Sequence, residues 1–186
     1  MPGNASPEYP WYTVVAGTEI EQGDILLGCP RLIIQAEAIT DPGRAKVEVE
    51  AVDAIILTQS CDLAIRADGR CEADDVMLCP VTQKKDLATH KVFQHGERWD
   101  EVRKGRQAYF HVLNACQLPN LLLDFMLIDF HHVYALNTEI VRQFATNQGP
   151  RPRLAPPYRE HLSQAFARLF MRVGLPTDIP AFGRKK

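Results

Sequence analysis

The order of apolar patterns along the chain constrains its fold more than any other feature of the sequence. Up to residue 136, apolar side chains come in short runs or alternate with polar ones, as they do in β-strands. After residue 136 they recur with the period of about 3.6 residues that marks an amphipathic helix. Strands followed by helices favour an α+β fold, in which a strongly bent antiparallel sheet or small barrel carries the helices on one side.

The individual elements follow from local patterns. We expect strands at 11–15, 25–34, 47–57, 76–81 and 107–113, a long strand or a bent pair within 121–136, and a short helix ending at Gly105. Asn137 is a plausible cap for a helix that stops at Gly149-Pro150. The clearest helix follows Pro156-Pro157, and its apolar stripe consists of Leu162, Ala165, Phe166, Leu169, Phe170 and Val173.

Length and composition indicate one domain. A chain of 186 residues with 46% hydrophobic residues can bury a core without disulfides or metals. We expect an extended lead-in at 1–19, a single barrel-plus-helix domain at 20–176 and a basic tail at 177–186. Neither a secretory signal nor a membrane span is evident, and the five cysteines are irregularly spaced, so we expect a cytoplasmic protein with reduced thiols.

Charge is unevenly distributed along the chain. The net charge is −2, but residues 140–186 carry nine Lys or Arg against two acidic residues, a net of +7. This segment predicts contact with RNA, DNA or an acidic partner; the alternative is that it folds back on the acidic part of its own chain or of a dimer mate. The arginines that would bind are Arg151, Arg153, Arg159, Arg168 and Arg172.

Several segments, taken in order, resemble the MazF/PemK-like toxin family. The likeness runs from about Gln22 to Leu175. The segments that carry it are Gly23-Asp24-Ile25, Ala54-Ile55-Ile56-Leu57, Val81-Thr82-Gln83, Met126-Leu127-Ile128-Asp129 leading to Asn137–Phe144, and Tyr158–Val173. The resemblance implies an SH3-like (MazF/PemK-type) antiparallel β-barrel with C-terminal helices, and it implies a homodimer.

The same resemblance implies sequence-preferring cleavage of single-stranded RNA. In that family, cleavage depends on an arginine before the central strand and on a Thr or Ser at the end of the next strand. Thr82 occupies the hydroxyl position, but the arginine position falls near Val52-Asp53, where no residue is basic. Arg44 or Lys46, in the preceding loop, is the expected substitute. The guanidinium would neutralise charge on the phosphorane, and the hydroxyl would donate a hydrogen bond to it.

The segment Thr58-Gln59-Ser60-Cys61-Asp62-Leu63 places polar residues directly after a buried strand. This segment, together with Pro157–Leu162, also resembles a set of uncharacterised small bacterial proteins, which implies a bacterial origin. One interpretation makes Cys61 a nucleophile or ligand beside Asp62, with His131 or His132 as its base. The other is a tight turn in which Cys61 packs as a small apolar side chain.

A cofactor is not expected, and zinc is the alternative. Its ligands would be Cys29, Cys61, Cys79 and His132, three of which lie near the ends of expected strands. The chain has none of the short ligand pairs typical of structural zinc. The adjacent histidines should point to opposite faces if they lie on a strand.

Three functions remain open at this point. The first is a binding or regulatory module that acts on a protein or RNA partner in a toxin–antitoxin-like or defence locus. The second is an endoribonuclease that uses Thr82 and a displaced Arg44. The third is a thiol- or metal-dependent enzyme centred on Cys61 and Asp62.

Overall fold

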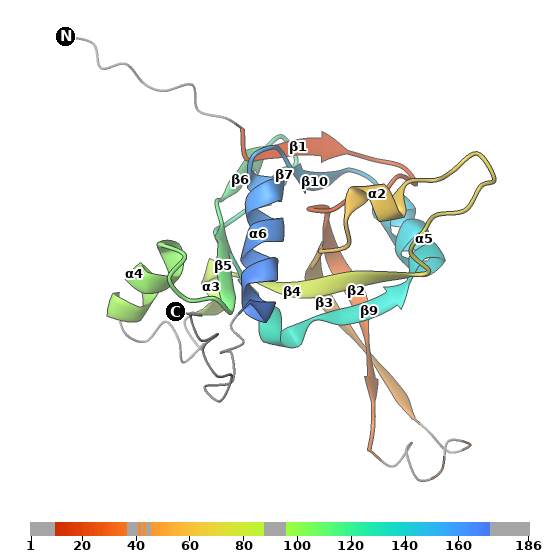
Figure 1. Ribbon diagram of the computed structural model, residues 1–186, viewed down its shortest axis with the longest axis horizontal. Coiled ribbons are helices and arrows are strands. Elements are labelled where there is room, and N and C mark those ends of the chain that lie inside the picture. The colour runs from red at the N-terminus through yellow and green to blue at the C-terminus, as the bar shows by residue number, and fades with distance from the viewer. Residues whose placement is uncertain (1–9, 37–40, 42, 44–45, 88–95, 172–186) are drawn as a thin grey trace, which may run out of the picture.

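The computed structural model describes residues 10–36, 41, 43, 46–87 and 96–171 (Figure 1). Residues 1–9 of the predicted lead-in at 1–19, together with Arg44, Arg172 and the predicted basic tail at 177–186, lie outside these residues. The chain forms an α+β protein with antiparallel sheets and a helix near its C-terminus.

The main sheet has six antiparallel strands in the order β2-β3-β4-β8-β5, and β9 also pairs with β4. Their bounds are Ile25–Ile34 (β2), Val47–Ile56 (β3), Asp75–Gln83 (β4), Phe110–Leu113 (β5), Met126–Asp129 (β8) and Tyr134–Asn137 (β9). Each of these strands falls in a segment where the apolar pattern predicted one. Among the described residues, the ladders do not join into a ring, because β2 and β5 remain the two ends of the path.

The strand β4 holds the sheet together by pairing with three others. Its second half pairs with β8 and its first half with β9, while β3 lies along its other edge. A 3-10 turn, η3 (Phe130–His132), separates β8 from β9. The segment 121–136 is therefore not one long strand but a bent series of shorter ones, because the chain leaves the sheet at η3 and returns to the same edge of β4.

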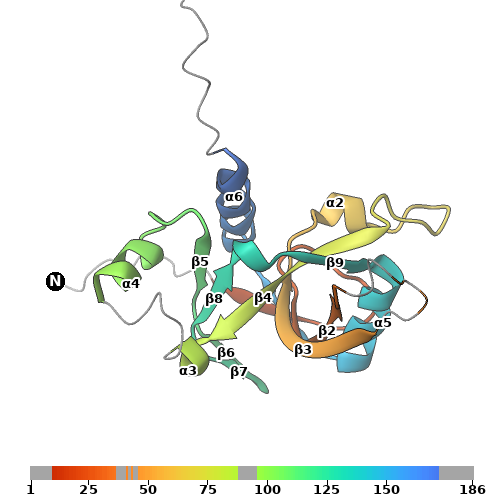
Figure 2. The same cartoon turned by 90° about the horizontal axis from the view of Figure 1, so that it is seen from below.

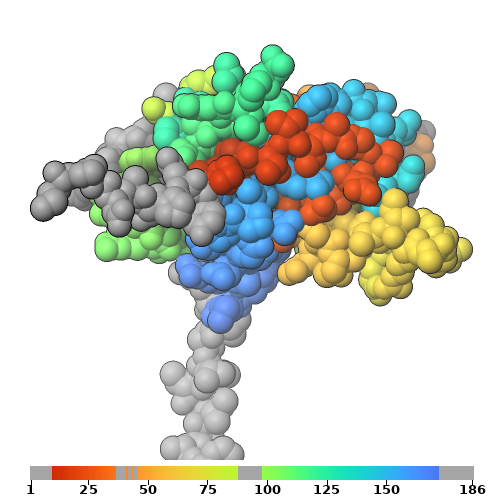
Figure 3. Space-filling view, turned by 90° about the horizontal axis from the view of Figure 1, so that it is seen from above, coloured from red at the N-terminus to blue at the C-terminus, as the bar shows by residue number. Residues whose placement is uncertain are grey.

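Two small ladders lie outside the main sheet. The strand β1 (Tyr12–Val15) pairs with β10 (Arg151–Leu154), and β6 (Cys116–Leu118) pairs with β7 (Leu121–Leu123). The sequence analysis did not identify β10, since Arg151-Pro152-Arg153 has neither an apolar run nor a favourable strand composition. In Figure 3 the first described residues run across the surface beside the C-terminal segment, and the ring of Trp11 stacks on that of Tyr158 at 3.7 Å.

The two predicted C-terminal helices are present as α5 (Thr138–Gln148) and α6 (Tyr158–Phe170). Asn137 caps α5 by accepting a hydrogen bond from the Glu139 N–H at 3.1 Å. Gly149 ends α5 in the left-handed region with φ +79°, as a C-terminal glycine typically does. The expected short helix before Gly105 is α4 (Gly96–Arg103), and the described residues also include two single turns, α2 (Ser60–Leu63) and α3 (Lys84–Leu87).

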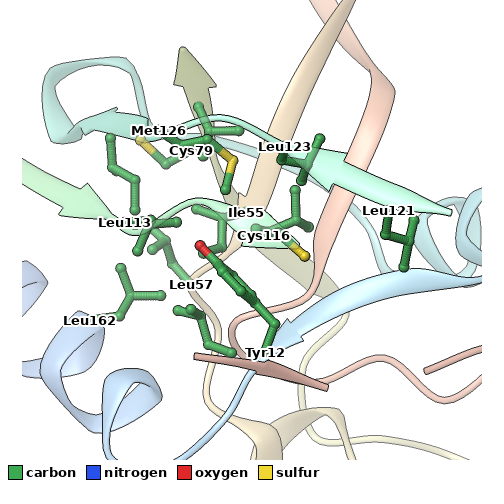
Figure 4. Packing of buried hydrophobic residues seen from close by; sticks show 14 of the residues in the cluster. Tyr12, Ile55, Leu57, Cys79, Leu113, Cys116, Leu121, Leu123, Met126 and Leu162 are labelled. Carbon is green, nitrogen blue, oxygen red and sulfur yellow. The ribbon is translucent and has the colours of Figure 1, made fainter. Parts of the chain in front are cut away.

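The core lies on both faces of the main sheet. One cluster surrounds Tyr12 beneath α6, and Figure 4 shows its side chains converging between the β5–β8 side of the sheet and that helix. A second cluster lies beneath α5 and contains Leu26, Cys29 and Ala54. A third, smaller cluster lies at the opposite end of the molecule, where α4 sits beside β5 (Figure 2).

Candidate functional site

The structure separates the predicted catalytic residues. Thr82 lies near the end of β4, whereas Cys61 and Asp62 lie in α2, and Arg44 is outside the described residues. Thr82 and the Cys61–Asp62 pair therefore have to be considered as two different sites.

Thr82 lines a pocket of about 230 Å³. Its other lining residues are Arg31, Pro80, Leu127, Asp129 and His132. Thr82 is directly opposite Leu127 in the β4–β8 ladder, and side chains two residues apart on a strand share a face, which places Asp129 on the same face as Thr82. The pocket thus combines a guanidinium, a hydroxyl, an imidazole and a carboxylate.

Arg31 is the residue of this pocket that the sequence analysis missed. A bulge in β2 shifts its register against β3 between Leu26 and Cys29. One extra residue reverses which side chains face which side, so Arg31 shares a face with Leu26 and not with Ile25. If side chains alternated strictly from Ile25 onward, Arg31 would lie on the same face as Ile25, which is not the face that it occupies. Two signs of the bulge were available in the sequence: Gly28, which has φ +68° there, and Pro30, which marks a break or bulge in a strand.

Arg31 has a carboxylate partner that it can exchange. Its Nη2 lies 2.8 Å from Oε2 of Glu50, and the two side chains are 30% and 48% exposed. Ion pairs this accessible to water contribute only about 0–1 kcal/mol. A phosphate oxygen can therefore replace Glu50 at small cost.

Asp129 organises the two histidines. Its Oδ1 lies 2.6 Å from His131 Nδ1, and its Oδ2 lies 3.6 Å from His132 Nε2. Both histidines are exposed, because they lie in η3 and not on a strand, which corrects the expectation that they point to opposite faces of a strand. The ring of His131 stacks on Tyr109 with the centroids 4.2 Å apart. His132 is the one that lines the pocket with Thr82.

The polar segment after β3 is largely architectural. The Thr58 hydroxyl is buried and accepts a hydrogen bond from the Met77 N–H at 2.7 Å. The Ser60 hydroxyl accepts one from the Gln22 N–H at 3.2 Å. Cys61 is exposed, and its thiol donates to Asp62 Oδ1 at 3.3 Å. The proposed bases, His131 and His132, lie in η3 and contact Asp129, the last residue of β8, instead of Cys61.

The four suggested zinc ligands are not gathered. Cys29 and Cys79 belong to different core clusters, while Cys61 and His132 are exposed in α2 and η3. Burial raises the pKa of the Cys29 thiol, and burial together with the charge of Asp129 raises the pKa of Cys79 to about 12. Within the described ranges, no group of three or more His, Cys, Asp or Glu is placed to hold a metal ion.

Three of the five predicted binding arginines pair with acidic residues of their own chain. Arg151 is fully buried, and its Nε donates to Asp24 Oδ2 at 2.8 Å. Arg153 pairs with Asp24 and Glu21, and Arg159 donates to Glu21 Oε2 at 2.8 Å. The fold-back interpretation of the basic segment is confirmed for these three residues. The burial of Arg151 excludes it from a surface that meets a partner.

Arg168 remains exposed on α6.

In the part of the chain that the structure describes, no helix has the length and apolarity to cross a membrane. Comparison with protein-family models, with curated proteins and with solved structures gave no match.

Proposed function

We propose that the protein binds single-stranded RNA and cleaves it at the pocket of Arg31, Thr82 and His132, on a MazF/PemK-like barrel. One observation carries this proposal: Arg31 lines the same pocket as Thr82, and so supplies the guanidinium that was missing at Val52-Asp53. It comes from β2, the strand before β3, and takes the role first suggested for Arg44. The Gly23-Asp24-Ile25 segment that leads into β2 and the apolar second half of β3 support the same family resemblance.

The chemistry of these groups suits a phosphodiester. His132, beside Asp129, would accept the proton of the substrate 2′-OH. The 2′ oxygen forms a bond to phosphorus, the bond to the 5′ oxygen breaks, and that oxygen takes up a proton from water. Arg31 and the Thr82 hydroxyl would stabilise the extra negative charge on the pentacoordinate phosphorus. The products are a 2′,3′-cyclic phosphate and a 5′-hydroxyl end.

Cleavage of a labelled single-stranded RNA in the presence of a chelator tests this function. The wild-type protein should yield products with 5′-hydroxyl ends and should leave the matching DNA intact, because DNA lacks the nucleophile. Thr82→Val should lower the rate by about 100-fold, the effect of removing one donor from a developing oxyanion.

The matched control is Thr13→Val, which removes the hydroxyl of an exposed residue of β1 far along the chain from the pocket. This variant should cleave at the wild-type rate. Absence of cleavage by the wild-type protein, or an equal loss in both variants, would contradict the proposal.

A second candidate function is a binding module, and an exposed apolar surface favours it. Beyond the body of the sheet, β2 and β3 extend as a two-stranded arm (Figure 1). On one face of this arm, Leu32 lies opposite Val49 and Ile34 opposite Val47, and these four side chains are 49%, 64%, 66% and 53% exposed. Contiguous exposed apolar surface of this kind typically marks an interaction site.

The occupant that fits this face is a second copy of the chain. Arg31, Glu48 and Glu50 all lie on the opposite face of the arm, so the apolar face carries no charged side chain between Leu32 and Ile34 or between Val47 and Val49, within the described part of the arm. Such a face complements itself across a two-fold axis, whereas a nucleic acid or an acidic protein finds no charge on it to pair with. A homodimer through the arm is thus the association that charge favours.

Sedimentation analysis checks this dimer. We expect the wild-type protein to sediment as a dimer at micromolar concentration, and Leu32→Lys to shift it to a monomer. Ile33→Lys provides the control, because Ile33 is the adjacent residue on the opposite face and is 36% exposed. A monomeric wild-type protein, or equal dissociation of both variants, would refute the arm interface.

A further inference from the structure

A second polar cavity lies on the other face of the sheet, between β5 and α6. Its volume is about 270 Å³. Its lining residues are Gly105, Gln107, Ala108, Phe110, His111, His161, Gln164, Ala165 and Arg168. In α6, His161, Gln164 and Arg168 are spaced i, i+3 and i+7, so all three lie along one side of the helix. That side faces His111 across the cavity.

This cavity is separate from the pocket of Thr82. In the β5–β8 ladder, His111 is opposite Ile128 and Phe110 is opposite Asp129. Neighbouring side chains on a strand point to opposite faces, so His111 points away from the face that Asp129 shares with Thr82. An inference about this cavity is independent of the proposed ribonuclease function.

The lining of the cavity combines a permanent positive charge with two titratable rings. Arg168, His111 and His161 contribute to it, and none of the described residues that line it is a carboxylate. Glu101 lies close by, but its Oε2 accepts a hydrogen bond from Gln107 Nε2 at 2.7 Å. Within the described ranges, the side chains of His111, His161, Gln164 and Arg168 make no hydrogen bond or ion pair.

The environment of His111 disfavours the protonated form of its ring. Burial, together with the nearby charges of His161 and Arg168, lowers the pKa of His111 to about 4. His111 is consequently neutral near neutral pH. An anion between these three groups would reverse the electrostatic part of this effect, since it would favour the protonated ring.

We propose that the cavity of His111, His161 and Arg168 binds a phosphate group. A guanidinium with five donors and two imidazoles match the several acceptor oxygens of a phosphate, and Gln164 adds a neutral donor at the rim. The volume admits a phosphate with a small attached group. The phosphate can belong to a free ligand or to a nucleic-acid backbone.

Protonation should be coupled to binding. The titratable and charged groups that face His111 are His161 and Arg168 on α6. At the mouth of the cavity, Gln107 donates a hydrogen bond to Glu101. On β8, the residue opposite His111 is the uncharged Ile128. A bound anion raises the pKa of His111 toward its ordinary value, so binding takes up a proton. Affinity for phosphate in one fixed charge state should therefore increase as the pH falls toward about 5, where free His111 is still largely neutral.

The test uses inorganic phosphate as the probe, with calorimetry for affinity and NMR of the histidine rings for protonation. Phosphate at millimolar concentration should raise the pKa of His111 by a unit or more. Arg168→Gln and His161→Gln should each weaken phosphate binding at least about tenfold, as expected for the loss of one charge-assisted hydrogen bond. Arg66→Gln removes an exposed arginine that pairs with Glu72 and lines neither the cavity nor the pocket of Thr82, so this variant should bind phosphate as the wild type does. Because His161 and Arg168 are exposed on α6, these variants should fold, and circular dichroism checks that they do.

Two further arms identify the source of the phosphate. If a short single-stranded RNA displaces inorganic phosphate from the cavity, the ligand is a nucleic-acid backbone; if it does not, the ligand is a small phosphorylated molecule. Unchanged His111 signals at tens of millimolar phosphate, or wild-type affinity in Arg168→Gln, would overturn the proposal. Neither result bears on RNA cleavage, which Thr82→Val tests separately.

Discussion

Asp24→Asn should lower the free energy of unfolding by about 3–5 kcal/mol, the cost of breaking a buried ion pair by removing one partner. The Asp24 and Arg151 side chains are both 0% exposed. The substitution preserves the shape of the side chain but removes its negative charge, which leaves the Arg151 guanidinium buried without a counterion. Urea unfolding followed by circular dichroism measures the effect.

The predicted loss is large because Asp24 is the centre of a network. Its oxygens accept hydrogen bonds from Arg151 Nε at 2.8 Å, from Arg153 Nη2 at 3.0 Å and from Arg153 Nε. Arg151 also donates to the Gly17 carbonyl at 3.1 Å and to that of Glu19. The network thereby ties β10 to the start of β2 and to the segment that precedes it.

Glu21→Gln is the control for Asp24→Asn. Glu21 pairs with Arg153 and Arg159, but its side chain is 33% exposed, so water screens both pairs. Its loss should cost no more than about 1 kcal/mol. If Asp24→Asn destabilises the protein no more than Glu21→Gln does, the buried network does not hold β10 in place.

Arg31→Ala should lower the rate of RNA cleavage by about 100- to 1,000-fold, if Arg31 stabilises charge in the transition state. The loss should appear mainly in kcat, because the extra negative charge forms only during the reaction. Arg31→Lys should recover part of the rate, since it restores the charge without the two-pronged geometry of a guanidinium. Initial rates on a single-stranded RNA with one cleavage site measure these effects.

The control for this series is Arg103→Ala in α4. Arg103 is another exposed arginine with a carboxylate partner, Asp100 at 2.6 Å, but it does not line the pocket. Its removal also makes the net charge of the chain, which is −2, more negative by one unit, and so it reports any general effect of charge on RNA binding. Equal losses in Arg31→Ala and Arg103→Ala would show that Arg31 has no specific part in the reaction.

Local sequence patterns were sufficient to predict the two C-terminal helices. The apolar stripe of α6, the cap at Asn137 and the stop at Gly149 depend on residues within one or two turns, so they can be identified in the sequence. The strands β2, β3 and β4 were identified for the same reason. By contrast, β10 has a composition that does not favour a strand. It pairs with β1 because Asp24 binds both of its arginines.

The candidate site was only partly predictable. Thr82 was identified from the family resemblance, and His132 was considered only as a base for Cys61 or as a zinc ligand. Arg31 could not be placed, because a bulge at Gly28 reverses the alternation of β2. The cavity of His111 and Arg168 was also missed, since the two residues lie on elements that are far apart in sequence.

The α+β class, the position of most elements and the excess of positive charge near the C-terminus could all be predicted from local patterns, because periodicity, capping and composition act over short stretches of chain. Which charges pair and which residues share a pocket became clear from the folded arrangement of the chain. Asp24 meets Arg151 across 127 residues, and Arg31 meets Thr82 only after a shift in strand register. Such contacts depend on how strands align and on which faces become buried, and one inserted residue in one strand is enough to change them.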